Sequence, residues 1–426
     1  MELKPGYKQS GVGVIPGDWD VEVTTDLVEA NSPICYGVVQ VGQDTHDGIP
    51  IVAIKYLKDI GNSPLHRTST ALEQPYARSR VRGGDVLISI KGTIGRVGIV
   101  PEGFEGNISR DLARMRPNEE HCAEYIAQQL QARTTQERIS RAAVGTTRLE
   151  FSIAALRQFE LPVPSTLAEQ RAIAMALGDV DALQVGLDRL IAKKRDLKQA
   201  AMQQLLTGQT RLPGFNGEWR DATLGQIVTR ISTGLNPRQN FRLNAGGSFF
   251  YVTIKNFGEG MLRLDEECDL IDEAAWRRIN ERADLKKDDV LFASIGRVGD
   301  AYLITETPKN WNINESVFTL RPDKEQVVPL MLFYLLTNKS VKDALGQGVT
   351  GSTFKSIKHA DLKTIPCRLP ASQAEQAAIA AVLSDMDAEL STLVKRRDKT
   401  RDLKQAMMQE LLTGKTRLVP AGTTDA

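Results

Sequence analysis

The chain contains one stretch of sequence twice. Residues 168–212 align with residues 374–418 without a gap, and more than half of the aligned positions are identical. The run RDLKQA fills 195–200 and again 401–406. A helix needs only apolar spacing in order to pack, so packing alone does not explain why charged residues and glutamine repeat. We expect each copy to bind the same partner, through Arg195, Asp196, Lys198 and Gln199 in the first copy and Arg401, Asp402, Lys404 and Gln405 in the second.

The duplication reaches beyond this stretch. IVAIK at 51–55 matches YVTIK at 251–255, GGDVLISIKGTIGRVG at 83–98 matches KDDVLFASIGRVG at 287–299, and NISRDLARMRP at 107–117 matches NINESVFTLRP at 312–322. The segments between these matches do not align. Two copies are too few for a solenoid, which needs three or more repeats to bury a core. The chain is therefore expected to be two units, each a variable globular part followed by a repeated helix.

Length and pattern give the domain plan. A chain of 426 residues that is 41% hydrophobic can bury two or three separate cores. We predict a first domain over 1–160, a repeated helix over 161–212, a second domain over 213–367, and a second repeated helix with a tail over 368–426. DVLISI and DVLFAS have strand character, whereas AEYIAQQLQA and PLMLFYLLT have helical length and spacing. The predicted class is α+β, with two globular α/β domains.

The repeated stretches predict two long helices. The first is expected from about Leu167 to Leu206, with Gly208 as its stop. A heptad stripe runs through Ile173, Leu177, Val180, Leu187 and Leu190, and another through Ile379, Leu383, Met386, Leu390 and Leu393. Apolar residues return later at Leu197 and Leu403. Because each helix has one main stripe, we expect an antiparallel coiled-coil pair, an internal pseudo-twofold repeat, and domains at opposite ends.

Composition narrows the compartment and the chemistry. The N-terminus has no apolar core of a signal peptide and no run of 18 apolar residues occurs, so we expect a cytoplasmic protein without membrane contact. Cys35, Cys122, Cys268 and Cys367 lie far apart, which favours reduced, buried thiols. Net charge is only +1, yet arginines cluster in one part of the chain. The basic cluster contains Arg78, Arg80, Arg82, Lys91, Arg96, Arg110, Arg114, Arg116, Arg133, Arg138, Arg141 and Arg148.

That cluster has two interpretations. Phosphate binding needs a basic face rather than a basic chain, and a solvated surface with compensating acids is the alternative. Gly92, Gly95 and Gly98 could cradle a phosphate, but strand-like runs flank them on both sides, which favours a hairpin.

The motifs of several enzyme classes are missing from the sequence. NSPI at 31–34 lacks the second proline and the aromatic residue of amino-methyltransferases, and TGKT at 413–416 lacks the glycine of a P-loop. The four histidines show no metal-ligand spacing. We therefore expect no enzyme and no metal or cofactor bound by this chain itself.

The order of these pieces resembles the DNA-specificity (S) subunit of type I restriction–modification enzymes. The likeness is carried by GDVLISIKGTIGRVG, by GTTRLEF at 145–151 with the following LPVPS, and by the twin helices AEQ…RDLKQA…LLTG, and it covers about Pro16 to Leu418. It implies two target-recognition domains, each reading one half of a bipartite site in double-stranded DNA. It also implies two methyltransferase (M) subunits, which bind S-adenosylmethionine, and restriction (R) subunits that join for cleavage.

Sequence readout requires side chains on loops that reach base edges. The candidates are Lys91, Thr93, Arg96, Thr146, Thr147 and Arg148 in the first domain, and Ser294, Arg297, Thr350, Ser352, Thr353 and Lys355 in the second. The second domain lacks the insertion 91–93, so we expect the two half-sites to differ, with the helices fixing the gap between them. A DNA-binding scaffold or regulator without a methyltransferase partner is the alternative, and the missing motifs count against a self-sufficient enzyme.

Overall fold

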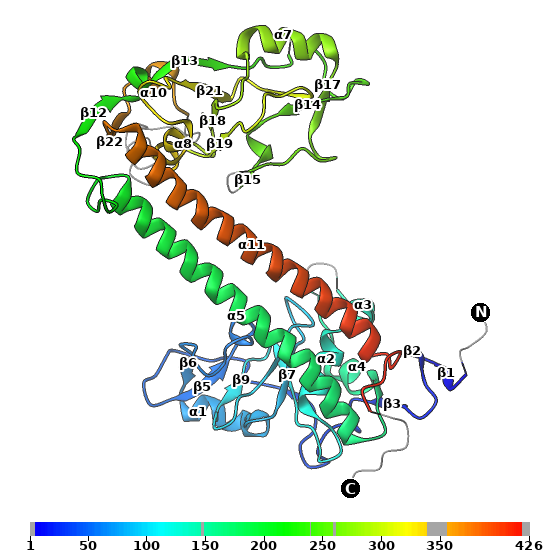
Figure 1. Cartoon of the computed structure of the whole chain (residues 1–426). Helices are drawn as coiled ribbons and strands as arrows, with labels where there is room; N and C mark the ends of the chain where they lie inside the picture. The colour runs from blue at the N-terminus through cyan, green and yellow to red at the C-terminus, as the bar shows by residue number, and fades with distance from the viewer. Residues whose placement is uncertain (1–4, 146–148, 239, 259–260, 339–355, 420–426) are drawn as a thin grey trace. The chain divides into compact units, whose positions relative to one another are not determined.

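The computed structural model describes residues 5–145, 149–238, 240–258, 261–338 and 356–419. The chain divides into two compact units, one made of residues 1–188 and 395–426 and the other of residues 189–394. Each unit holds one globular domain, the first half of the helix that follows it, and the last half of the other repeated helix (Figure 1). Packing therefore divides the chain inside both helices, whereas the sequence-based plan gave each helix a segment of its own.

The first domain is built on two sheets. One is antiparallel with the order β4-β10-β7-β8, and in the other β5 lies between antiparallel β6 and parallel β9. The strands are β1 Tyr7–Ser10, β2 Gly13–Pro16, β3 Asp20–Val23, β4 Cys35–Tyr36, β5 Ile49–Val52, β6 His66–Thr68, β7 Val86–Ser89, β8 Val97–Ile99, β9 Asn107–Ile108, β10 Leu112–Met115 and β11 Glu160–Val163. The helices are η1 Ile54–Tyr56, α1 Thr70–Glu73, η2 Gln74–Ser79, α2 Ala123–Gln131, α3 Arg133–Ala142 and α4 Ile153–Arg157.

The second domain repeats this topology. Its sheets have the orders β13-β21-β18-β19 and β17-β14-β20, and β14 again pairs antiparallel on one side and parallel on the other. The strands are β12 Trp219–Thr223, β13 Val228–Thr233, β14 Phe249–Val252, β15 Phe257–Gly258, β16 Met261–Leu262, β17 Asp269–Ile271, β18 Val290–Ala293, β19 Ala301–Leu303, β20 Trp311–Ile313, β21 Val317–Pro322 and β22 Pro366–Pro370. The helices are α6 Leu224–Ile227, η3 Ile254–Asn256, α7 Glu273–Ala283, α8 Pro329–Thr337 and α10 His359–Lys363.

The strand register is also shared. Leu112 pairs with Ser89 in the first domain, and Val317 pairs with Ala293 at the matching place in the second. All four residues of β7 and all four of β18 are buried, because β-branched and aromatic side chains fill both faces of these central strands. The predicted α+β class and the internal repeat are confirmed, as are the predicted helices α2 and α8.

The glycine-rich segment after β7 is a hairpin, as its flanking strands predicted. β7 and β8 pair antiparallel, and Gly92 and Gly95 in the turn have φ values of +72° and +79°. L-residues with side chains rarely adopt such angles, so the glycines allow the chain to reverse.

The repeated helices are α5, Leu167–Leu205, and α11, Gln373–Leu411. Within each unit their segments run antiparallel. Glu169 pairs with Arg417 and Asp181 with the earlier Lys404 in the first, and Glu375 pairs with Arg211 and Asp387 with the earlier Lys198 in the second. One part of the predicted stripe is wrong, because Leu190 is 39% exposed. Ile191 is buried in its place. A spacing of 3.6 residues per turn moves a straight helix off a strict seven-residue pattern.

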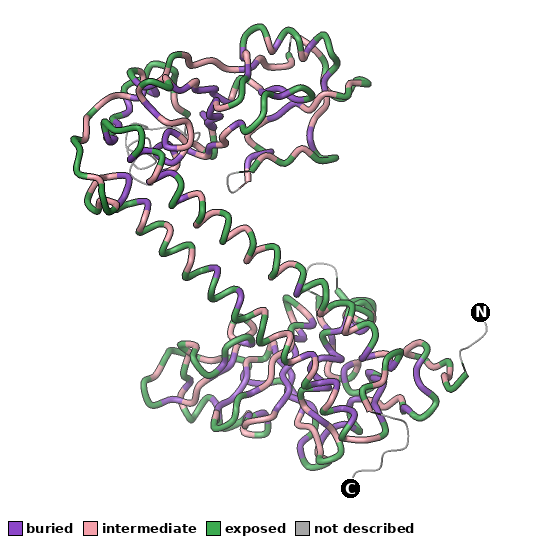
Figure 2. The backbone as a smooth tube through the Cα atoms, viewed as in Figure 1, coloured by how far each residue is buried: buried purple, intermediate pink, exposed green. Residues whose placement is uncertain are grey.

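Burial is concentrated in the strands of each globular domain and is sparse along the middle of α5 and α11 (Figure 2). The four cysteines are free and buried, as their spacing predicted. In the part of the chain that the structure describes, none of the helices combines the length and the apolar character needed to cross a membrane.

Candidate functional site

A repeated Glu–Arg clasp joins the start of one long helix to the residues after the other. In the first unit Glu169, which is 2% exposed, accepts two hydrogen bonds from Arg417, one of them at 2.7 Å. In the second unit Glu375 accepts two from Arg211, both at 2.7 Å. Bidentate Arg–carboxylate pairs are strong and specific in geometry. The repeated Glu and Arg therefore have a role inside the chain.

The neighbouring glutamines attach each domain to its helix. The Gln170 side-chain oxygen accepts the backbone N–H of Cys122 at 2.9 Å, and Gln376 accepts that of Val328 at 2.9 Å. These N–H groups precede α2 and α8, and each glutamine also donates to a proline carbonyl before its own helix. Both copies of the AEQ motif thus hold the domain on the helix.

Two reciprocal ion pairs tie the helices to each other. Lys404 lies 2.6 Å from Asp181, and Lys198 lies 2.5 Å from Asp387. Asp181 also accepts a hydrogen bond from Gln128 on α2, and Asp387 accepts one from Tyr334 on α8. Each aspartate therefore joins both helices and the domain.

These pairs revise the argument for partner binding at two positions. Lys198 and Lys404 were predicted to dock a partner because they repeat, and the structure gives that repeat an intramolecular cause. The sequence contained the signal, because the aspartate and the lysine recur with the same spacing in both copies. What the repeat alone did not reveal is that each lysine pairs with the aspartate of the other copy.

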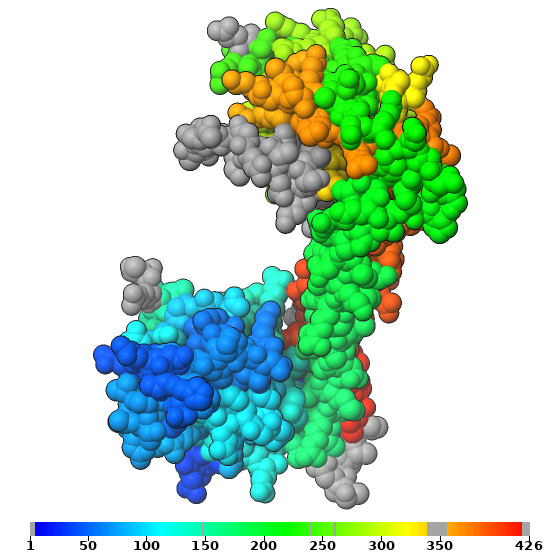
Figure 3. Space-filling model, turned by 90° about the vertical axis from the view of Figure 1, so that its left-hand side faces the viewer, coloured from blue at the N-terminus to red at the C-terminus, as the bar shows by residue number. Residues whose placement is uncertain are grey.

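The other repeated residues of RDLKQA form an exposed surface on each helix. We call Arg195, Asp196, Leu197 and Gln199 the first docking face, and Arg401, Asp402, Leu403 and Gln405 the second docking face. All eight are exposed, and the two leucines are 48% and 54% exposed. The apolar pattern had suggested that these leucines continue the packing stripe, which they do not. Figure 3 shows one long side of α5 uncovered.

The first set of predicted base contacts lies on the β7–β8 hairpin. Thr93 and Arg96 are exposed, whereas Lys91 is half-buried and pairs with Glu150 at 3.2 Å. The Ser89 hydroxyl donates to the Thr93 carbonyl and accepts the Arg96 backbone N–H, which fixes the turn. Thr146, Thr147 and Arg148 lie outside the described residues.

The second set is placed differently. Ser294 is 4% exposed, and its hydroxyl donates to the Ser316 carbonyl at 2.8 Å. Arg297 pairs with Asp300 at 2.9 Å and donates to the Phe257 carbonyl at 2.7 Å. Ser294 thus has a structural partner in the interior, which leaves Arg297 as the surface candidate. Thr350, Ser352, Thr353 and Lys355 lie outside the described residues.

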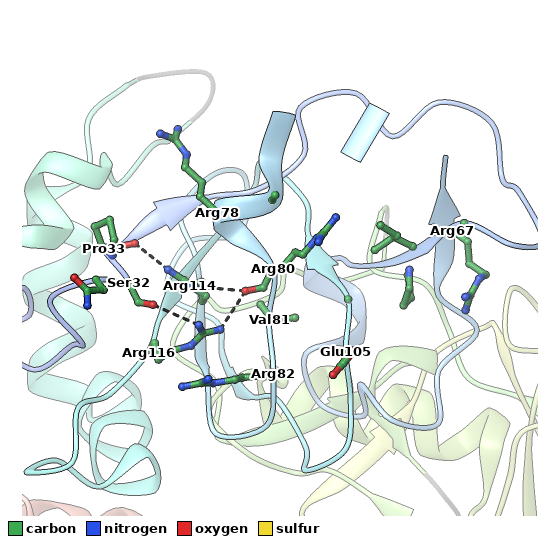
Figure 4. Close-up of a pocket in the computed structure, with 16 residues that line it drawn as sticks. Ser32, Pro33, Arg67, Arg78, Arg80, Val81, Arg82, Glu105, Arg114 and Arg116 are labelled. Atoms are coloured by element: carbon green, nitrogen blue, oxygen red, sulfur yellow. Dashed lines mark hydrogen bonds between the residues drawn. The ribbon is translucent and has the colours of Figure 1, made fainter. Parts of the chain in front are cut away.

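Five arginines of the predicted basic cluster surround one cavity in the first domain (Figure 4). The cavity measures about 720 Å³ and lies where the β4-β10-β7-β8 sheet meets the β6-β5-β9 sheet. Its arginines are Arg67, Arg78, Arg80, Arg82, Arg114 and Arg116. Arg67 was not part of the predicted cluster, which began at Arg78.

Three of these arginines have carboxylate partners. Arg116 binds Asp85 bidentately, with both distances 2.7 Å, and Arg82 lies 2.8 Å from Glu29. Arg80 binds Glu73 in the same bidentate way, and this bond holds the pKa of the buried Glu73 carboxyl below its ordinary value. These pairs neutralise half of the arginine charge around the cavity.

The described residues contain no group of three or more His, Cys, Asp or Glu placed to hold a metal ion. The groups that the described residues present for binding are arginine cations, hydrogen-bond donors and the exposed faces of the two long helices.

Comparison with known proteins identifies similar chains. Residues 43–194 and 216–400 match the family described as type I restriction modification DNA specificity domain. The type I restriction enzyme EcoBI specificity subunit of Escherichia coli is 27% identical over 214 residues, which are 49% of this chain and 44% of that one. This chain therefore aligns with less than half of that relative's length. The putative MjaX specificity subunit of Methanocaldococcus jannaschii is 25% identical, covering 97% of both chains.

Two solved structures share the fold. The S subunit of a type I restriction–modification system from M. genitalium has a TM-score of 0.60 at 16% identity, covering 96% of this chain and 98% of that one. A chain from a structure on complex assembly and conformational transition of the type I R-M system has a TM-score of 0.54 at 18% identity, covering 94% and 99%.

Proposed function

Because this chain belongs to the family of type I restriction–modification DNA specificity domains, we propose that it reads an asymmetric bipartite DNA site and scaffolds a methyltransferase complex. Its part is DNA recognition and not catalysis. Each globular domain reads one half-site. This proposal rests on one observation: the two units share the same fold and the same helix contacts, but their domains expose different side chains.

The difference between the surfaces supports an asymmetric site. The two domains share strand order and register, and the insertion expected at 91–93 is not there, because seven residues connect β7 to β8 and seven connect β18 to β19. The hairpins differ in side chains instead, and the first exposes Thr93 and Arg96. At the matching place the second domain presents Arg297 next to Asp300. Base edges are distinguished by the donors and acceptors that reach them, so different loops read different bases.

The two docking faces support a pair of equivalent partners. Each carries an exposed leucine among repeated polar residues, which is the mixture of apolar and polar groups found at protein interfaces. We assign one methyltransferase subunit to each face. S-adenosylmethionine belongs to those subunits, and restriction subunits join the assembly for cleavage.

The assembly is tested by charge reversal in one docking face. The double variant Arg195→Glu/Leu197→Glu, co-expressed with its methyltransferase, should retain one methyltransferase subunit in native mass spectrometry. Val185→Glu is the matched control, because Val185 is 49% exposed on the same helix but does not repeat. It should retain two subunits. Retention of two subunits by variants of either face would contradict the assignment.

The reading of DNA is tested by exchange of one domain. Residues 220–366 are replaced by the corresponding part of a relative, and methylated adenines are mapped in cells that express the chimera. We expect one half of the methylated site to change while the other half stays the same. A change in both halves argues against two independent readers, and an absence of methylation argues for a regulator without a methyltransferase.

A further inference from the structure

One arginine of the cavity is buried without an ion-pair partner among the described residues. Arg114 is 2% exposed, and its guanidinium donates to the carbonyls of Pro33 at 3.1 Å and Arg80 at 3.4 Å (Figure 4). Its Nε atom is buried without a hydrogen-bond partner, and burial lowers the pKa of the group. Among the described residues no carboxylate forms an ion pair with it. Burying a charge this way is costly unless something compensates it.

Two further cations face the same space. Arg67 and Arg78 are exposed lining residues, and neither side chain forms an ion pair within the described part of the chain. Glu105 is the acidic residue of the lining itself. Once the paired Arg80, Arg82 and Arg116 are set aside, three arginine cations remain around the cavity against one carboxylate. The cavity therefore has an excess of positive charge.

The second domain shows that the fold does not require this excess. Its Arg321 binds Asp289, with both distances 2.9 Å, as Arg116 binds Asp85. Arg116 also donates to the carbonyl of Arg80, and Arg321 donates to the carbonyl of Asp284. An aspartate thus stands where the first domain has Arg80.

The position of Arg114 differs in the same direction. By strand register Arg114 lies opposite Leu87, and Thr319 lies opposite Leu291 at the equivalent place in the second domain. Asp284 also accepts a hydrogen bond from Arg230. Lys286 lies 3.3 Å from the same carboxylate. The second domain thus has an aspartate and a threonine at the two positions where the first domain has Arg80 and Arg114.

We propose that the arginine cavity of the first domain binds backbone phosphates of DNA, with Arg114 at its floor and Arg67 and Arg78 at its rim. This inference rests on the proposed function. Guanidinium groups match phosphate oxygens in bidentate geometry, and a buried one gains most because water competes least. A cavity of about 720 Å³ with exposed arginines at its edge has room for adjacent phosphates of one strand. Such contacts set the position of the domain on DNA without reading bases.

The rim arginines give the first test. The full chain, with any methyltransferase subunits it retains, is titrated onto a random-sequence duplex of about 40 base pairs over a series of salt concentrations. Arg67→Ala/Arg78→Ala should weaken binding roughly 10-fold and reduce the slope of log K against log salt by about one to two. The matched control is Arg133→Ala/Arg277→Ala, two exposed arginines outside the cavity that each pair with a glutamate four residues away. It should bind as the wild type does.

The floor arginine gives the second test. Arg114→Thr introduces the residue of the second domain, and the thermal midpoint reports whether the variant is folded. A folded Arg114→Thr chain should lose duplex affinity and salt slope as the rim variant does, and Arg114→Lys should recover part of both. Wild-type affinity and slope in the rim variant, or in a folded Arg114→Thr chain, overturn the proposal.

A further arm separates DNA from free phosphate compounds. Pyrophosphate is titrated into the same variants by calorimetry. If the arginines control pyrophosphate binding but leave duplex binding unchanged, DNA is not the occupant and the proposal is wrong. If the wild-type chain with its retained subunits fails to bind duplex at all, the proposed function itself fails and this inference falls with it.

Discussion

The two units use the same contacts to hold their helices and different residues on their domain surfaces. The clasp Glu169–Arg417 in the first unit matches Glu375–Arg211 in the second, and both units contain an Arg–Asp pair with a buried aspartate next to the central strand of the main sheet. Around that pair, however, the first domain has Arg80 and Arg114 where the second has Asp284 and Thr319. Identity between the copies marks what holds each domain on its helix, and under the proposed function difference marks what meets DNA.

The units also differ in how the clasp is linked to its domain. In the second unit the chain runs directly from Arg211 to Trp219 and β12. In the first unit Arg417, near the end of the described chain, meets Asp18 and Trp19 near its beginning, with hydrogen bonds of 2.9 Å to Asp18. In the first unit, noncovalent contacts thus hold the clasp against the domain, whereas in the second unit the continuous chain does so.

The glycines of the two LLTG runs show why this turn repeats. Gly208 and Gly414 have φ values of +72° and +67°, and an added Cβ would lie 3.1 Å from Trp219 or 2.3 Å from Pro16. Glycine avoids both the strain and the clash. The turn therefore packs against the start of a domain in both units, once within a continuous segment and once between the chain's two ends.

The largest expected effect concerns a glycine in each domain. A Cβ on Gly37 would lie 1.8 Å from the Ile108 carbonyl oxygen, and one on Gly234 would lie 1.7 Å from that of Ile313. Gly37→Ala and Gly234→Ala should each destabilise their own domain by about 4 kcal/mol or more, because backbone must move. Urea unfolding with domain-resolved hydrogen exchange measures this. A large loss of stability in only one domain would show that the two domains do not depend on the same close backbone contact.

The next effect separates the two clasps. Glu169→Ala leaves Arg417 without its buried partner and removes the acceptor of the Trp19 indole N–H, so it should cost about 3 kcal/mol. Glu375→Ala should cost less, because the chain itself still joins Arg211 to its domain. Urea denaturation of the two variants gives both free energies of unfolding. Equal costs would mean that chain continuity contributes nothing to the second clasp.

Much of the framework was predictable because it is periodic or duplicated. The limits predicted for the first helix, about Leu167 to Leu206, agree with α5 within one residue at its end. The matching motifs gave two domains of one fold. Periodicity failed at Leu190, Leu197 and Leu403, which are exposed, because apolar spacing does not say which side of a long helix has a neighbour.

The internal ties were harder to predict. Glu169 and Gln170 lie at the start of one repeated helix, and Arg417 lies after the end of the other, 248 positions after Glu169 in the sequence. Sequence identity between the two copies shows that these residues are important, but it does not show which residues they contact. Arg67 lines the arginine cavity because β6 pairs with β5, and the sequence did not predict that pairing. Which loop residues touch bases depends on DNA, so Thr93, Arg96 and Arg297 stay predictions.

A smaller effect distinguishes internal lysines from docking residues. In double-mutant cycles, Lys198→Met with Asp387→Asn and Lys404→Met with Asp181→Asn should each give a coupling of about 1 kcal/mol, since the pairs are partly exposed. Native mass spectrometry should still show two methyltransferase subunits in both lysine variants. Loss of a methyltransferase subunit from a stable Lys198→Met chain would show that Lys198 also contributes to docking.

The smallest effect tests the contact that only the first unit has. Hydrogen bonds from Arg417 hold the pKa of Asp18 below its ordinary value of 3.8, so the ionised carboxylate is favoured in the folded chain. A lowered carboxyl pKa contributes stability above the ordinary value, and the contribution is lost as pH falls through the folded pKa. Asp18 is 40% exposed, so Asp18→Asn should cost only about 0.5 to 1 kcal/mol at neutral pH.

The pH dependence and a matched variant then decide the cause. The difference between Asp18→Asn and the wild type should vanish as pH falls below 3.8, as measured by urea unfolding across acidic pH. The control is Glu218→Gln in the second unit, where Arg211 donates to the Gly217 carbonyl at 2.9 Å. That variant should unfold like the wild type at every pH, because continuous chain replaces the carboxylate contact there. An Asp18→Asn difference that persists in acid would show that the side chain acts through packing and not through its charge.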